Sequence, residues 1–404
     1  MEDEALYDRT VALVTHSFST GPPQELKRFL APRVKRLLYI SHPFSYCKDV
    51  RSWMELYEGG GRIKESHAPA FKGTEVMYYL KDVFLTLYYT FKTGGRYDVY
   101  IGADNLNALA GLILRGLGRV DKVVFYTIDY IPKRFENSLM NRLYHFIDRL
   151  CCSRCDFLWN ISPNMADARF KNRVSRERCA PEAVVPNGSN FSEIKRLTIA
   201  EIDRHRLAFM GHLRKNQGVE LLLAAFPEIL KKVKGATLDI IGTGPLEEEL
   251  KALAGRLGIS GKVRFSGFIK DHAELEERLA RSAVGVAPYS PSDDSFTYYA
   301  DPGKPKTYLA AGLPVIITDV PLIAKEIERK RAGLLVGYDE KALAGAAIRL
   351  LTDEPFYAEC RANAIALGAL FDWNNIFESA IKRTFEVFDD KAGLHERKKG
   401  FAVQ

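Results

Sequence analysis

The chain has 404 residues and a net charge of +7, with 47% hydrophobic and 27% charged residues. This composition is typical of a soluble globular protein, and the length accommodates two domains of ordinary size. No uncharged apolar run approaches the roughly 18 residues of a membrane span, and no long basic tract or basic-aromatic module indicates a nucleic-acid partner.

The acidic N-terminus lacks the apolar segment of a signal peptide. Six cysteines in so long a chain are typical of reduced thiols, so we expect a cytoplasmic protein. Cys152 and Cys155 form a C-x-x-C pair with Cys179 nearby, but the chain has no second such pair and no close pair of histidines. We therefore expect no metal site.

The first half alternates predicted strands with predicted helices. Apolar runs predict strands over 11–15, 37–41, 99–101, 122–127 and 156–161. His16 and Gly21 lie in the loop after the first strand, and Asp129 directly follows the strand 122–127. Loops at the carboxyl ends of parallel strands carry the ligand-binding side chains of open α/β sheets. A simple turn at Gly21, or a helix cap at Asp129, is the structural alternative.

The positive excess lies entirely in this half, because residues 1–200 hold 29 Lys and Arg against 22 Asp and Glu. The basic residues are scattered, apart from 33–36 and a run over 169–178. A predicted helix over 71–91 is unusually aromatic. A solvated basic surface and a helix face packed in the core explain both features. An anionic membrane surface or a phosphate-bearing acceptor is the alternative.

A polar linker over 192–204 leads to a second α/β half. The loop 211–218 follows a predicted strand and precedes a long helix, with Arg214 and Lys215 within it. Gly242 and Gly244 form a glycine loop after a strand, which does not complete a dinucleotide motif because Glu247 replaces the third glycine.

The stretch 301–319 reads as a turn, a short helix, a glycine stop and a buried strand. Gly303 lets the backbone approach a ligand, and Lys304 lies beside the first-turn amides of the helix. Unpaired N–H groups, the helix dipole and the lysine all favour an anion, so a phosphate fits there.

These motifs resemble GT-B glycosyltransferases of the family-4 type, also called glycosyl transferases group 1. Lys304, Thr307, Tyr308, Ala310, Gly312, Pro314 and Val315 follow the family's K-x-x-E-Y-x-A-x-G-x-P-V segment. Residues 186–188 resemble its I-P-N-G element, residues 265–268 its F-x-G-F turn, and the loop 211–218 its G-R-L-x-x-x-K-G element. The chain departs at Thr307, where the family has a ribose-binding glutamate. It departs again at His212 and Gln217, which replace the usual Arg and Lys.

The resemblance implies an α/β protein of GT-B fold, with two Rossmann-like domains facing each other across a cleft. We expect an acceptor-side domain over 1–200 and a nucleotide-sugar-binding domain over 201–370. A crossover helix over 371–390 would brace the first domain, and a tail follows over 391–404.

The resemblance also implies the residues of the site. Asp129 is the expected catalytic residue on the acceptor side, and His16 and Gly21 belong to the acceptor and phosphate loop. The expected donor-binding residues are Arg214, Lys215, Gly242, Gly244, Phe268, Ile269, Asp301, Gly303, Lys304 and Thr307.

The implied activity is transfer of a sugar from a UDP- or GDP-sugar to a glycan or lipid-linked acceptor, with retention at the anomeric carbon. No Asp-x-Asp metal motif occurs in the sequence, and fixed cations with a helix N-terminus can stabilise the departing diphosphate without metal. We therefore expect no cofactor and no metal. The expected location is cytoplasmic, with the inner face of the membrane as an alternative. An inactive nucleotide-sugar-binding partner subunit and a UDP-sugar epimerase of the same fold stay open as alternatives.

Overall fold

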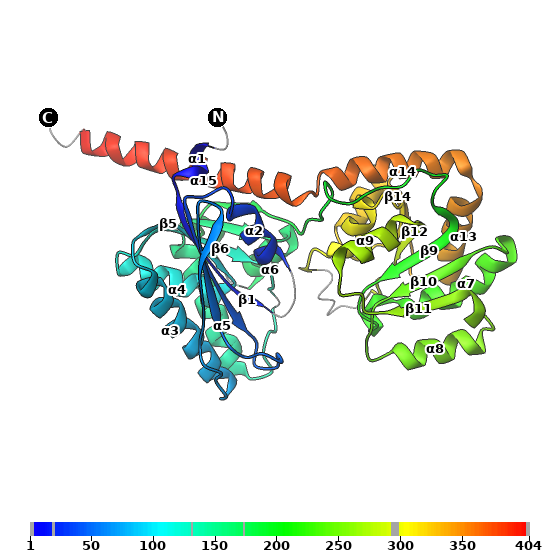
Figure 1. The fold of residues 1–404 in the computed structure, drawn as a ribbon, viewed down its shortest axis with the longest axis horizontal. Coiled ribbons are helices and arrows are strands. Elements are labelled where there is room, and N and C mark those ends of the chain that lie inside the picture. Colours follow the sequence, from blue (N-terminus) through cyan, green and yellow to red (C-terminus); the bar gives the residue numbers. More distant parts are fainter. Residues whose placement is uncertain (1–3, 18–20, 131, 173, 292–298, 401–404) are drawn as a thin grey trace. The chain divides into compact units, whose positions relative to one another are not determined.

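The computed structural model describes residues 4–17, 21–130, 132–172, 174–291 and 299–400. The chain divides into two compact units (Figure 1). Unit 1 comprises residues 1–186 together with 376–404, and unit 2 comprises residues 187–375.

Unit 1 is built on an eight-stranded sheet with the order β4-β3-β2-β1-β5-β6-β7-β8. The strands from β2 to β8 in this order run parallel, whereas β3 and β4 form an antiparallel hairpin beside β2. Its elements are α1 (Glu4–Tyr7), β1 (Thr10–Ser17), α2 (Pro22–Leu30), β2 (Arg36–Pro43), β3 (Trp53–Glu58), β4 (Gly61–His67), α3 (Glu75–Thr93), β5 (Tyr97–Ala103), α4 (Asn105–Gly116), β6 (Val120–Thr127), α5 (Ser138–Arg154), β7 (Phe157–Asn160), α6 (Pro163–Lys171) and β8 (Glu182–Val184).

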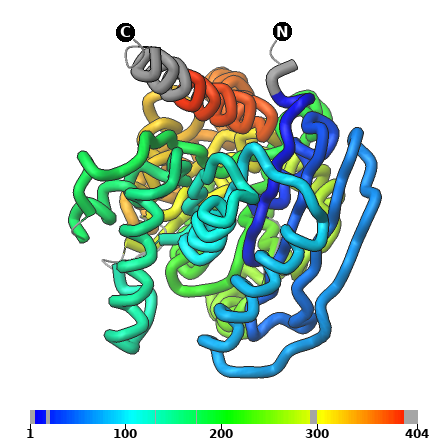
Figure 2. Tube along the Cα trace, turned by 90° about the vertical axis from the view of Figure 1, so that its left-hand side faces the viewer, coloured from blue at the N-terminus to red at the C-terminus, as the bar shows by residue number. Residues whose placement is uncertain are grey.

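Alternate residues of the central strands pack against helices on opposite faces of this sheet. Ala12 and Val14 belong to the core beneath α4 and α5. Val11 on the other face lies beside Leu30 of α2 and Ile381 of α15. Figure 2 shows α3, α4 and α5 next to one another on their face. The short apolar runs of the sequence therefore form strands that are buried on both sides.

The predicted strands of this half are present, and two details differ from the prediction. The hairpin of β3 and β4 was not predicted, because the exposed strand Gly61–His67 is polar and lacks an apolar pattern. The aromatic helix begins at Glu75 rather than at 71, because Thr74 is its N-cap in an extended conformation.

Unit 2 is a six-stranded parallel sheet with the order β11-β10-β9-β12-β13-β14. Helices α7 and α13 pack on one face, and α9, α11, α12 and α14 pack on the other. Its elements are β9 (Asp203–Met210), α7 (Val219–Lys232), β10 (Thr237–Ile241), α8 (Glu247–Arg256), β11 (Val263–Gly267), α9 (His272–Ala280), β12 (Ser282–Ala287), α11 (Gly303–Ala310), β13 (Val315–Thr318), α12 (Ile323–Arg329), β14 (Gly333–Val336), α13 (Glu340–Thr352) and α14 (Glu354–Ala369).

The last helix, α15 (Trp373–Gly400), returns the chain to unit 1. The ring of Phe377 lies 5.6 Å from that of Phe29 on α2, and Trp159 donates a hydrogen bond of 2.9 Å to Thr384. Gly188 in unit 2 lies so close to the ring of Trp373 that a β-carbon would approach it to 2.6 Å. The Pro186-Asn187-Gly188 element therefore packs against the start of this helix.

Candidate functional site

The candidate site of unit 2 lies at the carboxyl edge of its sheet, next to β9. The strands that follow β9 are added first on one side, as β10 and β11, and then on the other, as β12 to β14. The loops after β9 and β12 therefore diverge at this point, where open α/β sheets bind their ligands. The N-terminus of α11 belongs to this edge as well, because Lys304 contacts β9 and its loop.

Lys304 is the central cation of this site. Its side chain is buried, and Nζ donates a hydrogen bond of 2.7 Å to Oε1 of Gln217. Nζ also lies 4.0 Å from the ring centroid of Phe209 and 4.9 Å from that of Tyr289. Within the described ranges, no carboxylate pairs with it. Burial lowers the pKa of Lys304 to about 7. A buried cation whose partner is a neutral amide is well placed to take an anion.

Arg214 and Lys215 are exposed on the loop after β9. The same loop carries Gln217, which holds Lys304. The structure therefore places Lys304 against the loop that carries Arg214 and Lys215. Lys304 is buried, whereas Arg214 and Lys215 face solvent. His212 stands at the position of the family's arginine. It is exposed too, so it does not replace the arginine inside the site.

Gly242 and Gly244 have a structural reason to be glycine. A β-carbon at Gly242 would lie 2.0 Å from the carbonyl oxygen of Gly211, and its φ of +136° disfavours other residues. A β-carbon at Gly244 would lie 2.5 Å from the carbonyl oxygen of Leu213. Both glycines let the loop after β10 pack on the loop after β9. Their expected contact with a nucleotide stays a prediction.

Asp301 ties two segments of unit 2 together. Its Oδ2 accepts a hydrogen bond of 2.6 Å from the backbone of Asn187 and also pairs with Nζ of Lys306. Lys306 donates a second bond of 2.7 Å to the carbonyl of Asn187 and lies over the ring of Phe371. Burial raises the pKa of Asp301 and lowers that of Lys306. Lys306 was not predicted as a site residue, because a lysine on a helix is usually exposed to solvent.

The other predicted donor residues lie nearer to solvent. Phe268 is 74% exposed after β11, whereas Ile269 packs against the core of α9 and α11. A β-carbon at Gly303 would meet no atom within 4 Å, so space is open at the first turn of α11. Thr307 donates a hydrogen bond of 3.3 Å to the carbonyl oxygen of Gly303.

Unit 1 has a pocket of its own at the carboxyl edge of its sheet. The pocket is open to solvent, and its volume of about 730 Å³ includes part of that open solvent. It lies at the corresponding switch point, because β2 to β4 lie on one side of β1 and β5 to β8 on the other. The pocket is lined by His16, Phe44, Tyr79, Asp104, Asn105, Leu106, Phe125, Thr127, Asp129, Arg134, Phe135, Met140, Leu143, Tyr144, Ile147 and Asp148.

His16 is held firmly at this edge. Its Nε2 lies 3.2 Å from Oδ2 of Asp82, and its Nδ1 lies 3.0 Å from the side-chain nitrogen of Asn107. The side-chain nitrogen of Asn107 can only donate, so Nδ1 accepts and Nε2 carries the proton that Asp82 accepts. The ring also stacks on Phe44, with centroids 5.4 Å apart. Burial alone would raise the pKa of Asp82, but His16, His42 and Lys81 hold it below its usual value.

Asp129 lies in the pocket, as its position after β6 predicts. Its Oδ2 pairs with Arg134, whereas its Oδ1 is buried and has no hydrogen-bond partner. The N-cap of the next helix is Asn137, so the capping alternative for Asp129 does not hold for α5. Gly21, by contrast, is the N-cap of α2 with an extended backbone that other residues adopt as well.

Asp104 was missed by the sequence reasoning. It lies between β5 and α4, at the same kind of position as Asp129 after β6, and this placement was the available signal. Its φ is +74°, and its side chain makes no cap bond to α4. Its Oδ1 is buried without a partner. Burial, with the nearby charge of Asp129, raises the pKa of Asp104 to about 6.

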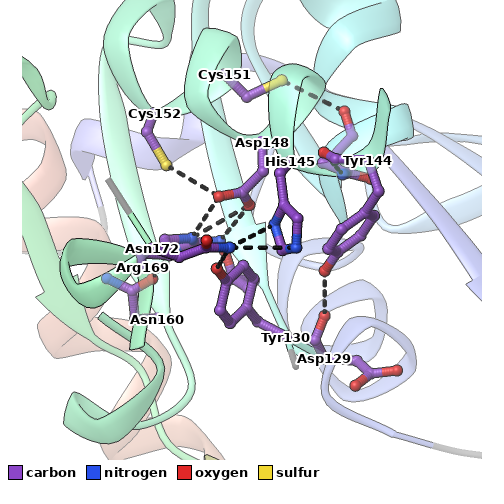
Figure 3. A network of polar contacts seen from close by, with 12 residues as sticks. Asp129, Tyr130, Tyr144, His145, Asp148, Cys151, Cys152, Asn160, Arg169 and Asn172 are labelled. Atoms are coloured by element: carbon purple, nitrogen blue, oxygen red, sulfur yellow. Dashed lines mark hydrogen bonds and ion pairs between the residues drawn. The ribbon is translucent and has the colours of Figure 1, made fainter. Parts of the chain in front are cut away.

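A buried polar network supports the floor of the pocket (Figure 3). Arg169 donates from Nε and Nη2 to Asp148 at 2.9–3.1 Å, from Nη1 to Asn160 at 2.6 Å and from Nη2 to Thr127 at 2.5 Å. The sequence indicated that the run 169–178 is a solvated basic surface. Arg169 is only 2% exposed, so this expectation is wrong for that residue. Its charge orients Asp148 beneath the ligand space.

The cysteines are all free thiols. Among the residues that the structure describes, no group of His, Cys, Asp and Glu is arranged to hold a metal ion. No helix in the described part is long and apolar enough to cross a membrane.

Comparison with known proteins extends these observations. Residues 204–353 match the family model of glycosyl transferases group 1. The chain is 26% identical over 244 residues to the phosphatidyl-myo-inositol mannosyltransferase of Mycolicibacterium smegmatis, covering 59% of this chain and 60% of the relative. The curated relatives are matched over part of their length only, from 36% to 60%.

Solved structures match nearly the whole chain at low identity. Sucrose-phosphate synthase from Thermosynechococcus elongatus has a TM-score of 0.71 and 18% identity, over 95% of this chain and 100% of that one. The Anabaena protein HepE in complex with UDP-glucose has a TM-score of 0.64 and 15% identity, over 94% and 99%. Residues 204–353 of unit 2 are therefore similar to the glycosyl transferases group 1, and the chain as a whole has the GT-B fold.

Proposed function

We propose that the protein transfers a sugar from a nucleotide-diphosphate sugar, a UDP- or GDP-sugar, to an acceptor that binds in the pocket of unit 1. The observation that carries this proposal is Lys304, a buried cation without a carboxylate partner in the described structure, beside the open first turn of α11. The GT-B relative HepE binds UDP-glucose, which supports the same class of donor here.

The diphosphate of the donor binds at the N-terminus of α11. Backbone N–H groups of the first turn and Nζ of Lys304 contact the phosphate oxygens, and the helix dipole adds to the attraction. Arg214 and Lys215 close over the phosphates from the exposed loop. These fixed cations perform the task that a metal has in other transferases, so the reaction proceeds without one.

The nucleoside lies beside the exposed ring of Phe268 and near Ile269. Thr307 takes the place of the family's glutamate and offers one hydroxyl to the ribose, whereas a carboxylate accepts from two. We therefore expect weaker ribose binding than in relatives with the glutamate.

In the transfer step, the bond between the anomeric carbon and the phosphate oxygen breaks, and a bond to the acceptor oxygen forms on the same face of the sugar. The acceptor's proton passes to the departing diphosphate, whose charge Lys304 stabilises. Asp129 accepts a hydrogen bond from the acceptor hydroxyl through its unpartnered Oδ1 and so orients it for attack.

Calorimetric titration with UDP, GDP and ADP, with and without EDTA, tests the donor site. We expect UDP or GDP to bind with equal affinity in both conditions. Loss of binding in EDTA that Mg²⁺ restores would contradict the metal-free site. Binding without any turnover of the sugar nucleotide would favour the inactive partner subunit, and an epimerised sugar nucleotide would favour the epimerase.

We also propose that the acceptor is a glycan or lipid-linked molecule and that unit 1 binds an anionic membrane surface reversibly. One face of α3 presents an exposed apolar stripe, at spacings of three and four residues: Met77, Leu80, Phe84, Tyr88 and Phe91. Helix α5, which packs on the other side of α4, exposes Leu139, Leu143 and Phe146. Such faces with cations at their edge, here Lys72, Lys92 and Arg142, are typical of interfacial helices.

The basic segment 33–36 contributes less than the sequence indicated. Val34 is buried, and Arg36 donates to the carbonyls of Thr93 and Gly94 at the end of α3 and pairs with Glu58. Lys35 is its exposed cation. The apolar stripe of α3 is therefore the stronger support.

Vesicle sedimentation with neutral and anionic lipids tests this association, and Leu80→Glu with Phe84→Glu is the informative variant. We expect binding to anionic vesicles that weakens with salt and is lost in the variant. The control is Ile63→Glu, an exposed apolar residue on β4. Failure of the wild-type protein to bind anionic vesicles at low salt would leave a soluble acceptor.

A further inference from the structure

Two carboxylate oxygens in the pocket of unit 1 have no hydrogen-bond partner among the residues that the structure describes. They are Oδ1 of Asp104 and Oδ1 of Asp129, and both atoms are buried. Both residues line the pocket, and each follows a parallel strand at its carboxyl edge. Buried carboxylate oxygens are costly unless a donor reaches them, so each indicates a missing hydrogen-bond donor.

Asp104 is the more informative of the two. An aspartate before a helix ordinarily accepts a bond from the first-turn amides, but this side chain makes none. Its backbone adopts a φ of +74°, which is unfavourable for a residue other than glycine. The chain thus holds a strained backbone and an unpaired carboxylate oxygen at the wall of the pocket.

One acidic and three basic groups surround Asp104. Those that act on it are Asp129, Arg134, His16 and Arg169. Arg134 is already paired with Asp129, and Arg169 with Asp148. Both ring nitrogens of His16 have partners. Each of these positively charged or ionisable groups therefore has a partner already, while the two carboxylate oxygens have none.

The remaining wall is largely apolar and aromatic, with Phe44, Tyr79, Phe135 and Tyr144 among its side chains. Such a wall suits the C–H faces of a sugar or cyclitol ring, and the carboxylate oxygens suit its hydroxyl or ammonium edge. A phosphate or carboxylate in this space would face the uncompensated charge of Asp104, because Arg134, the arginine among the described lining residues, is already paired with Asp129.

We propose that Asp104 and Asp129 together select an acceptor head group that carries hydroxyl or ammonium donors and no negative charge. This inference rests on the proposed function, since it names the acceptor class of the same pocket. Any phosphate of a lipid-linked acceptor then lies outside the pocket, and Asp104 is the residue that sets the charge preference.

Ligand-detected NMR titration at pH 7 with glucose, glucosamine and glucose 6-phosphate tests the proposal without any donor. We expect glucosamine to bind at least tenfold more tightly than glucose 6-phosphate. In Asp104→Asn this ratio should fall at least fivefold. Asparagine keeps the shape of the side chain and meets the same backbone strain as the native aspartate, so the fold should persist. Glucose 6-phosphate that binds at unit 2 does so equally in both proteins.

Asp49→Asn, an exposed carboxylate outside the pocket, is the control and should keep the wild-type ratio. Three results would overturn the proposal: no binding of any probe, tighter binding of glucose 6-phosphate in the wild type, or an unchanged ratio in Asp104→Asn. The relative affinity of the wild-type protein for glucosamine and glucose 6-phosphate tests the proposal even if the variant does not fold. Failure of nucleotides to bind would refute the proposed function and leave this result unaffected.

Discussion

Replacing Lys304 with methionine should separate binding from stability in unit 2. Methionine keeps the length of the side chain and its contacts with Phe209 and Tyr289, but it removes the charge and the bond to Gln217. We expect Lys304→Met to lose diphosphate binding and, unusually for a buried site, to raise the stability of the fold.

The magnitude follows from the pKa of Lys304, which burial lowers from 10.5 to about 7. Each pKa unit corresponds to about 1.4 kcal/mol, so the charged lysine costs the fold roughly 5 kcal/mol. The substitution also removes one hydrogen bond and two cation–π contacts, which together stabilise the wild type by roughly 2–3 kcal/mol. The net gain is on the order of 2–3 kcal/mol, or a rise of roughly 4–12 °C in the Tm of a unit of this size.

The pH dependence has a definite sign. Because the pKa of Lys304 is lower in the folded chain than in the unfolded chain, its penalty is fully present below pH 7. The penalty shrinks as the pH rises toward 10.5 and the lysine becomes neutral in both states. The stability difference between Lys304→Met and the wild type should therefore be largest at pH 6–7 and smaller at pH 9.

Scanning calorimetry of both proteins at pH 6.5 and pH 9, with titration of UDP and GDP, measures these effects. Lys325→Met, an exposed lysine on α12, is the matched control and should change neither stability nor binding. A lower Tm for Lys304→Met at pH 6.5, or nucleotide binding as tight as in the wild type, would refute the reasoning.

Four further predictions concern substitutions in the two candidate sites. The double variant Arg214→Ala with Lys215→Ala should weaken UDP or GDP by roughly 1.5–3 kcal/mol per contact and uridine or guanosine hardly at all; equal weakening in titrations of nucleotide and nucleoside would make both side chains mere surface. Thr307→Glu should tighten donor binding, and unchanged affinity with an intact fold would place the ribose elsewhere. Asp129→Asn should abolish transfer and leave nucleotide affinity nearly unchanged, so residual transfer near the wild-type rate would exclude Asp129 from the acceptor site. Gly242→Ala should destabilise unit 2 by at least about 2 kcal/mol in urea unfolding, because its β-carbon would lie 2.0 Å from a carbonyl oxygen.

Much of the fold was predictable because buried parallel strands are short apolar runs. The strand-and-helix alternation placed Asp129 and Lys304 at strand ends and at a helix N-terminus, where the structure has them. The hairpin of β3 and β4 was not predictable in the same way, since an exposed edge strand carries no apolar pattern.

The remaining site residues depend on tertiary facts that a sequence pattern does not contain. The position of Asp104 directly after a strand is visible in the sequence, but its positive φ and its oxygen without a hydrogen-bond partner are not. Arg169 reads as one more basic residue, yet Asp148, Asn160 and Thr127 from other elements enclose it. The glycines after β10 resemble a nucleotide loop, whereas the structure explains them by backbone packing.

Turnover of a sugar nucleotide is the most direct test of the central claim. Proton NMR of the protein with UDP-glucose and with GDP-mannose, in the presence of EDTA, follows the free nucleoside diphosphate and the anomeric proton of the released sugar. The proposed function predicts slow hydrolysis of one donor, with the α-anomer released first and the reaction abolished in Lys304→Met. Tight nucleotide binding with no release of either sugar, or release that requires added metal, would contradict it.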